Sequence, residues 1–457
     1  MTPFGIACSI FGGLMAILVL VLGGMSAFSS TKGYAVGELL GKSDANAYLT
    51  QKMSEFRQLD FKTVASGSVA NIVLGILVFA YFVSLVTVRW DFETPANLSN
   101  KASTAAASYA PYATMPRNAM ATTVQRAATT IPQEQLVLTN FYVSTANVAG
   151  LCFVKTNSEG TRAIYNKDAI RLSLLGGARA FVFDCWPDTT AGDYQHGPVV
   201  QTVEPGSLWR RTSFTATPLA APLSELMTQA FNSQYPSTSN DLIIVYLRFR
   251  TKDGKTPRSD TMNLTAQILQ STIQPYRMDA AFNRCRAQDQ IALLPLTTFA
   301  GKVLIVSNFN GAGTALADYI NVWHGQDELH RAMETSTSFA KNLPEAQKPS
   351  AIKSIQQQLT FVAPYGEDPA AESNAWDTAG AQAVGVHCCG LNMDPARVPQ
   401  SLKTMFVSDS FAIKPEALRY IPTTLPTPGM PPASFAAMGA GPTPGAIQTP
   451  PAMRVPG

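Results

Sequence analysis

Two long stretches without charged side chains restrict what the N-terminal part of this chain can fold into. Residues 1–31 contain no Asp, Glu, Lys or Arg, and Ile6 to Phe28 are mostly apolar. A second charge-free stretch separates Lys62 from Arg89. A helix that crosses a bilayer core needs about 20 apolar residues, and both stretches meet that length. The sequence therefore predicts a membrane hairpin over residues 1–90, with transmembrane helices at about 4–28 and 67–89.

A cleaved signal peptide and two buried core helices are the alternatives to this hairpin. The first stretch lacks the basic region that begins a signal peptide, which favours the transmembrane interpretation. The loop between the two stretches carries five basic residues, whereas only Arg89 and Lys101 follow closely after the second stretch. The positive-inside rule then places the loop in the cytosol and the large C-terminal part on the opposite side. We expect a two-pass integral membrane protein.

The charge content excludes one large class of partners. Charged residues make up 14% of the 457 residues, and the net charge is +3. Soluble proteins carry about 25% charged residues, and nucleic-acid-binding domains present a basic face or stripe that is absent here. The six cysteines are too few for a disulfide scaffold of this length. We expect no nucleic-acid partner.

Two segments have the composition of extended arms. Residues 91–133 are rich in Ala, Thr, Ser and Pro, which is typical of a linker or a surface-hugging arm. Residues 422–457 hold ten prolines and a single charge, Arg454. Such a tail cannot form a packed core by itself, and a proline-rich segment loses little conformational freedom when it binds a partner. We expect both segments to contact other proteins of an assembly, while the membrane hairpin contacts the lipid bilayer.

Between residues 134 and 421, β-rich runs alternate with helical patterns. The predicted strands are Leu136–Val143, Ala180–Cys185, Val199–Val203, Leu242–Arg248, Lys302–Val306, Leu359–Ala363, Ala383–Cys388 and Thr404–Val407. The predicted helices are Lys167–Leu175, Pro222–Asn232, Asn263–Gln270, Thr314–Val322 and Asp327–Ser338. Strands alternating with helices over this length predict an α/β fold, specifically a (β/α)8 TIM-like barrel between the membrane hairpin and the Pro/Gly-rich tail.

Four motifs in this region resemble phosphoinositide-specific phospholipase C. They are Ala169–Trp186, which ends in Asp-Cys-Trp, then Gly301–Ile305, then Trp376–Gln382 followed by Val384 and Asn392, and finally Lys414–Arg419. Together they cover the predicted barrel in the family's order. The resemblance implies a distorted (β/α)8 barrel with its site at the C-terminal ends of the strands. It also implies a chemistry in which a general base activates the inositol 2-hydroxyl, while histidines and a calcium ion assist at the phosphate.

The residues that the resemblance places in that site are largely substituted. Asn140 and Asp184 match the family's calcium ligands, but Thr139 stands where the family has a histidine. Val182 and Arg248 stand where the family has glutamates. The second histidine position falls either on His196 or on Thr202, depending on the alignment. The remnant site therefore consists of Asn140, Asp184, His196 and Arg248, and at least half of the catalytic positions are lost.

One pair of substitutions suggests what replaced the metal. Val182 and Asp184 lie two residues apart on one strand and so share a face. Arg248 projects from another strand, and its guanidinium could bind the carboxylate where a calcium ion would otherwise lie. We expect an Asp184–Arg248 ion pair, assisted by Arg250.

His387-Cys388-Cys389 is the other cluster that could carry chemistry. We expect it at the end of a strand, where barrel sites lie, and a nucleophilic Cys–His pair is one interpretation. Neighbours that would activate such a pair are not evident, so core packing is the preferred interpretation.

These observations lead to two hypotheses about function. The first is a membrane-anchored pseudoenzyme with a structural role in a large assembly and no cofactor; a minor capsid protein in the virion of a large icosahedral DNA virus would suit the anchor, barrel and tail. The alternative is an active membrane-bound phosphodiesterase acting on phosphoinositide or related headgroups. In that case His196 serves as acid or base, Arg248 neutralises the phosphate, and calcium is the cofactor to test. A headgroup-binding module that uses Arg248 and Arg250 without turnover is a third possibility.

Overall fold

The computed structural model describes residues 95–422, with gaps at 116, 157–159, 188–196, 202–216, 233–238, 252–255, 280–281, 283–290, 325–330 and 367. The two predicted transmembrane helices, His196 and the tail from residue 423 lie outside the described residues. Within the described part, no helix is long and apolar enough to cross a membrane. The chain divides into two compact units, one of residues 1–101 and 153–162 and one of residues 102–152 and 163–457. The second unit holds the sheet and the sites described below.

Among the described residues, eight strands of this unit pair in parallel, and these pairings close into a ring. In ring order they are β1 (Phe141–Ala146), β4 (Ala180–Trp186), β7 (Ile243–Phe249), β8 (Val303–Ser307), β9 (Val322–His324), β10 (Arg331–Thr335), β11 (Leu359–Val362) and β12 (Cys388–Leu391), which returns to β1. The α/β fold is as predicted, and the closed ring is consistent with a TIM-like barrel.

Short strands and helices make up the rest of the regular structure in the described part of the chain. The antiparallel additions are β13 (Phe411–Ile413) on β1, β5 (Val199–Val200) on β4, and β6 (Thr217–Pro218) on β5. The separate pair is β2 (Leu151–Thr156) and β3 (Gly160–Tyr165). The helices are α6 (Pro95–Ala107), α7 (Met120–Ala127), α8 (Lys167–Leu175), α9 (Ala220–Ala230), α10 (Ser259–Ile273), α11 (Phe339–Asn342), α12 (Lys348–Gln357), α13 (Pro369–Ser373), α14 (Thr378–Ala383) and α15 (Gln400–Met405).

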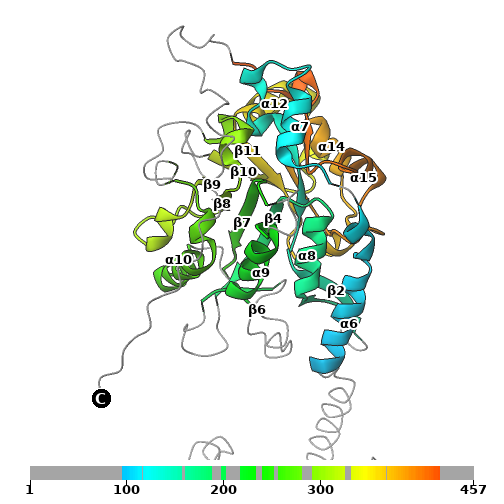
Figure 1. The fold of residues 1–457 in the computed structure, drawn as a ribbon, viewed down its shortest axis with the longest axis vertical. Helices are drawn as coiled ribbons and strands as arrows, with labels where there is room; N and C mark the ends of the chain where they lie inside the picture. Colours follow the sequence, from blue (N-terminus) through cyan, green and yellow to red (C-terminus); the bar gives the residue numbers. More distant parts are fainter. Residues whose placement is uncertain are drawn as a thin grey trace, which may run out of the picture. The chain divides into compact units, whose positions relative to one another are not determined.

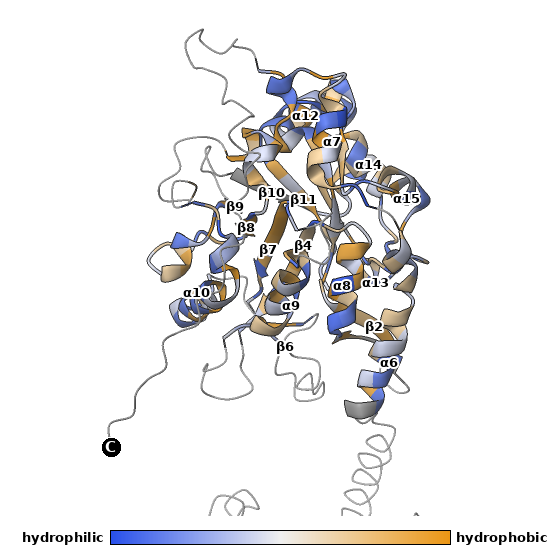
Figure 2. Cartoon of the chain, viewed as in Figure 1, coloured by the Kyte–Doolittle hydropathy of each residue, from blue (hydrophilic) through white to orange (hydrophobic). Residues whose placement is uncertain are grey.

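The longest apolar runs form strands and helices where the sequence predicts them. The strands β4, β7, β8 and β11 each fall within a residue of their predicted bounds, and α8 has the predicted bounds. In Figure 2 these strands are coloured mainly as hydrophobic, whereas the outer helices α10 and α12 show many hydrophilic residues. Asn166 caps α8 by accepting a hydrogen bond from the backbone N–H of Asp168 at 2.8 Å, and this satisfies a free donor of the first turn.

Other predicted elements are wrong, because short strands carry little periodic signal. Thr404–Val407 is the end of α15 and the turn after it, rather than a strand. The predicted helix Thr314–Val322 is instead a 3-10 turn that leads into β9. β12 begins at Cys388, where the predicted strand ends; α14 ends at Ala383, and residues 384–387 form a turn between the two.

The segment of residues 91–133 contains helical structure rather than only an extended arm. Met120 and Val124 of α7 belong to the same buried cluster as Val182, Tyr246 and other barrel residues. The α7 helix is fixed at its first residue, where the backbone N–H of Met120 donates to Asp241 at 2.6 Å. This helix therefore packs against the N-terminal ends of the barrel strands, at the opposite end of the barrel from β6 (Figure 1).

A buried lysine lies near that same end of the barrel. Lys414 follows β13, is 2% exposed, and donates through Nζ to the carbonyl of Gly385 at 2.6 Å. Its ammonium also lies 5.6 Å from the ring centre of Tyr142. Burial lowers the pKa of Lys414 well below its ordinary value, although Cys388 and Cys389 act in the opposite direction. The native protein therefore gives up this proton more readily than the unfolded chain does.

This lysine makes stability depend on pH in a defined direction. Below the ordinary lysine pKa of about 10.4, the unfolded chain binds the Lys414 proton more tightly than the native chain, so stability rises with pH toward that value. We expect Lys414→Met to flatten this rise, as measured by the urea midpoint of the full chain in a neutral detergent from about pH 7 to about pH 10. The exposed-face variant Lys348→Met is the control and should leave the slope unchanged. Equal slopes for wild type and Lys414→Met would contradict the prediction.

Candidate functional site

An ion pair lies at the C-terminal ends of two neighbouring strands. Asp184 of β4 and Arg248 of β7 are direct partners in the strand register. Arg248 Nε donates to Asp184 Oδ1 at 2.5 Å, and both side chains are at most 1% exposed. The expected Asp184–Arg248 pair is thus confirmed, in the position that the C-terminal ends of barrel strands give to functional residues.

The segment after β11 completes the bonding of this pair. Arg248 donates to the carbonyls of Ala363 at 3.0 Å and Pro364 at 3.1 Å. The second carboxylate oxygen of Asp184 accepts the backbone N–H of Gly366 at 3.0 Å. A buried charge pair is tolerated only when its remaining donors and acceptors are also bonded, and here they are. The pair therefore joins three strand ends, those of β4, β7 and β11.

Asn147 approaches the same segment from the end of β1. Its Nδ2 donates to the carbonyl of Pro364 at 2.8 Å, so Asn147 and Arg248 share this acceptor. Its Oδ1 is buried and has no hydrogen-bond partner among the described residues. Asn147 is thus the polar residue of the first strand that reaches the site, and it leaves one oxygen available.

Aromatic rings cover the charged pair toward solvent. The guanidinium carbons of Arg250 and Arg248 lie 3.8 and 4.5 Å from the ring centre of Tyr365. Arg250 also lies 5.4 Å from the ring centre of Trp186. Tyr365 is 44% exposed, whereas Arg248 beneath it is fully buried. Arg250 therefore contacts the rings of Tyr365 and Trp186, and its expected assistance to the ion pair stays a prediction.

A cavity of about 470 Å³ opens beside this cover. It is lined by Asn308, Phe309, His324, Ser336, Thr337, Ala363, Pro364, Tyr365 and Asp368, which follow or end β8, β9, β10 and β11. Its polar residues are mostly neutral, and it shares Ala363 to Tyr365 with the ion-pair site. This cavity is the mouth of the barrel as far as the described residues define it.

Two residues of the predicted remnant site lie elsewhere or outside the described part. Asn140 precedes β1, where its Nδ2 donates to the carbonyls of Gln135 at 2.7 Å and Tyr420 at 2.9 Å. Because Thr145 is level with Ala180, nine register steps separate Asn140 from Asp184, on the order of 20–30 Å along the strands. Asn140 therefore ties the chain's C-terminal segment to the N-terminal end of the barrel. His196 is not among the described residues.

His387 also lies at the N-terminal end of a strand, contrary to the expected position. Its Nδ1 accepts the backbone N–H of Thr360 at 3.1 Å, so Nε2 carries the proton that it donates to the carbonyl of Thr139 at 2.7 Å. Burial, and then the nearby Lys414, lowers the pKa of His387 well below its ordinary value. Burial raises the pKa of the Cys388 thiol to about 12. A neutral histidine bonded on both sides and a protonated thiol support the packing interpretation of this cluster.

The residues at the strand ends do not fit a calcium ion. Calcium requires several oxygen ligands, and the resemblance assigns such ligands to positions that hold Val182 and Arg248 here. Val182 is fully buried in the barrel core, and the guanidinium of Arg248 occupies one oxygen of Asp184. Within the described residues, no group of three or more His, Cys, Asp or Glu side chains could hold a metal. A cation beside Asp184 would meet the positive charge of Arg248.

Comparison with known proteins identifies solved structures of one family. No family model matches the chain, and no curated protein matches it. PLC21 from L. pealei is 15% identical over 63% of this chain and 38% of its own, with a TM-score of 0.45. PLC21 from S. officinalis is 14% identical over 64% and 39%, also at 0.45. A calcium-dependent phosphoinositol-specific phospholipase C from Pseudomonas sp is 14% identical over 59% and 95%, at 0.38.

The similarity concerns the fold, and the chain spans about two fifths of the length of the two PLC21 proteins.

Sequence reasoning missed Asn147 and Tyr365. The sequence predicts the first strand at Leu136–Val143, whereas Leu138–Asn140 is a 3-10 turn and β1 runs on to Ala146. The polar residue directly after the observed strand is Asn147, so a correct strand end would have found it. Tyr365 had no signal, because only the folded chain places it over Arg248.

The buried pair predicts a non-additive effect of mutation on stability. Arg248→Met alone leaves the Asp184 carboxylate buried without its cation and should cost about 3–5 kcal/mol in the free energy of unfolding. The double variant Asp184→Leu with Arg248→Met removes both charges and should cost less than Arg248→Met alone. Urea denaturation of the full chain in a neutral detergent measures both.

The exposed pair Arg258–Asp260, with side chains 61% and 62% exposed, supplies the matched control. Arg258→Met should cost less than about 1 kcal/mol. Additive losses for the Asp184 and Arg248 variants would show that the two side chains are not coupled.

Proposed function

We propose that this protein is a membrane-anchored, phospholipase C-like barrel that does not cleave phosphodiesters and acts as a structural scaffold. The observation that carries the proposal is the bonding of Asp184 to Arg248 and Gly366. A carboxylate with both oxygens engaged by a buried cation and a backbone amide is a structural group rather than a free metal ligand or base.

The composition of the chain supports the anchor and the scaffold role. The apolar stretches at about 4–28 and 67–89 are long enough to hold the protein in a bilayer. Because α7 packs into the barrel, we assign partner binding to the proline-rich tail from residue 422 and to the parts of residues 91–133 outside α7. A protein of this kind suits a large assembly built on a membrane, such as the virion of a large icosahedral DNA virus.

Activity on phosphatidylinositol vesicles tests the proposal directly. We expect the full chain in a neutral detergent to show no turnover with or without calcium, and no calcium-dependent rise in melting temperature. Both follow from a positive guanidinium beside the carboxylate that would bind the metal. Turnover that is lost in His196→Ala would overturn the proposal and establish the active phosphodiesterase instead.

A substitution at Arg248 tests whether the guanidinium is what excludes calcium. Arg248→Glu places a second carboxylate beside Asp184, and Asn147 Oδ1 is an unpartnered oxygen at the same strand ends. We expect this variant to melt at a lower temperature than wild type without metal, because two buried carboxylates repel each other, and to be stabilised by calcium.

Arg248→Gln carries no charge and is the matched control, which should show no response to calcium. If calcium stabilises wild type and Arg248→Glu equally, the guanidinium does not exclude the ion.

A further inference from the structure

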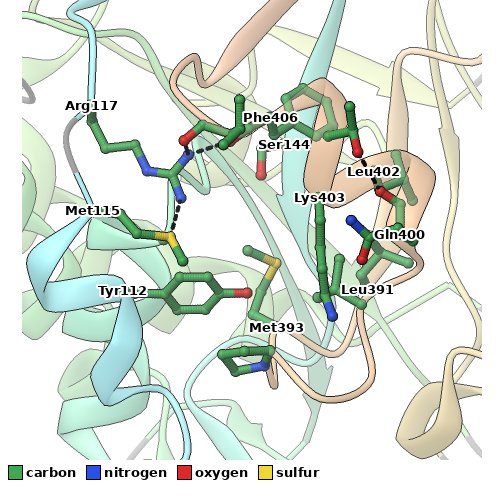
Figure 3. Close-up of a pocket in the computed structure, with 15 residues that line it drawn as sticks. Tyr112, Met115, Arg117, Ser144, Leu391, Met393, Gln400, Leu402, Lys403 and Phe406 are labelled. Atoms are coloured by element: carbon green, nitrogen blue, oxygen red, sulfur yellow. Dashed lines mark hydrogen bonds between the residues drawn. The ribbon is translucent and has the colours of Figure 1, made fainter.

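A second cavity, of about 380 Å³, shares no lining residue with the cavity at the barrel mouth. Figure 3 shows the residues that line it. It is formed by the 3-10 turn Ala110–Thr114, the β1–β12 pair and α15. Its lining is mainly apolar and includes Tyr112, Leu391, Met393, Val398, Leu402 and Phe406. Small-molecule sites typically have volumes of about 300–1,000 Å³, apolar walls and a few polar groups, and this cavity matches that description.

The rim of this cavity is apolar and exposed to solvent. Met115 is 39% exposed and Val407 is 60% exposed, and both line the cavity. They are two of the four large apolar residues that are exposed in the described part of the chain. An apolar rim around an apolar cavity favours a ligand with a hydrocarbon portion.

A cation without an anionic partner lines the same cavity. Arg117 donates to the carbonyls of Leu175 at 3.1 Å, Val407 at 3.0 Å, and Phe406. Among the described residues, the sole partner of its Nη2 is the sulfur of Met115, a weak acceptor, at 3.5 Å (Figure 3). Among the described residues, no carboxylate forms an ion pair with Arg117.

The charge of Arg117 is poorly compensated by the protein. Burial, and then the positive charge of Arg179, lowers the pKa of Arg117, while Tyr112 and Asp409 act in the opposite direction. The carboxylate of Asp409 is already bonded by Asn118, Thr123 and Arg126. A guanidinium stays protonated in proteins, so the charge must be met by carbonyls and by whatever enters the cavity.

A hydroxyl adds a second polar group to the lining of the cavity. Ser144 is 4% exposed and lines the cavity, and no hydrogen bond of its hydroxyl is found within the described residues. A hydroxyl can donate one hydrogen bond and accept others, so Ser144 is available to a polar group that enters the cavity. Lys403 also lines the cavity and has no ion pair among the described residues, so the site holds a second cation.

We propose that this cavity binds an anionic amphiphile, with its hydrocarbon chain against the apolar lining and its carboxylate or phosphate on Arg117. The apolar lining disfavours a bare phosphate ion, and the uncompensated guanidinium disfavours a neutral hydrocarbon. The site is separate from the strand-end ion pair and does not depend on whether the barrel has activity.

Photo-crosslinking of the full chain in a neutral detergent tests the site. The probe is palmitate that carries a diazirine on its chain, and labelled peptides are identified by mass spectrometry. We expect saturable labelling of the peptides around residues 112–117 and 391–407. Unlabelled palmitate and lysophosphatidate should both compete with the probe, and the two compare a free fatty acid with a phospholipid headgroup. Hexadecanol should compete about tenfold or more weakly, because it lacks the negative charge.

Two sets of variants locate the charge that binds the ligand. Arg117→Gln should weaken palmitate capture about tenfold or more and leave hexadecanol competition unchanged, whereas the exposed control Arg258→Gln should change neither. Val407 is at the exposed rim, where substitution leaves the core intact. Val407→Glu should weaken palmitate capture by repulsion, and Val407→Lys should not weaken it, so the test stands even if Arg117→Gln fails to fold.

Three results would overturn the proposal. They are labelling that does not saturate or lies outside these peptides, equal competition by hexadecanol and palmitate, and equal capture by Val407→Glu and Val407→Lys. If labelling does not saturate or lies outside these peptides, a hydrophobic segment of a protein partner becomes the occupant to consider.

Discussion

The buried bond between Arg248 and Asp184 determines how the C-terminal face of this barrel is built. Each partner would be costly to bury alone, so the two strands that carry them must end side by side with the guanidinium facing the carboxylate. The remaining donors of Arg248 and the second oxygen of Asp184 draw in the segment after β11. Asn147 donates a hydrogen bond to the same segment. The ring of Tyr365 in this segment lies against Arg248, and the ring of Trp186 lies against Arg250.

The same two strand segments carry a second buried ion pair at their opposite end. Arg179, directly before β4, donates through Nε to Asp241, two residues before β7, at 2.8 Å. At this end the arginine belongs to the β4 side and the carboxylate to the β7 side, the reverse of the Asp184–Arg248 pair. A slip of one residue between these strands would separate both pairs, so the charges specify the register that the apolar runs alone leave open.

These contacts bear directly on function. In a catalytic barrel, the strand ends offer side chains that can exchange protons or bind a metal. Here the charges at the strand ends bond one another, with Asn147 Oδ1 left without a partner among the described residues, and a separate outer cavity holds Arg117. A barrel whose central charged residues bond one another and stabilise the fold can still present binding sites on its outer surface.

The sequence by itself determined the α/β class, the strands β4, β7, β8 and β11, the helix α8 and the Asp184–Arg248 pair. Long apolar runs and the two-residue period of a strand are local signals, and a buried arginine must find a carboxylate. The tertiary structure decided the end of β1, and with it that Asn147 and not Asn140 reaches the site. It also placed His387 at the start of β12 and assembled the outer cavity from residues 112–117, Ser144 and residues 391–407. Such contacts join segments far apart in the chain, so they stabilise the protein only after the ring of strands has closed.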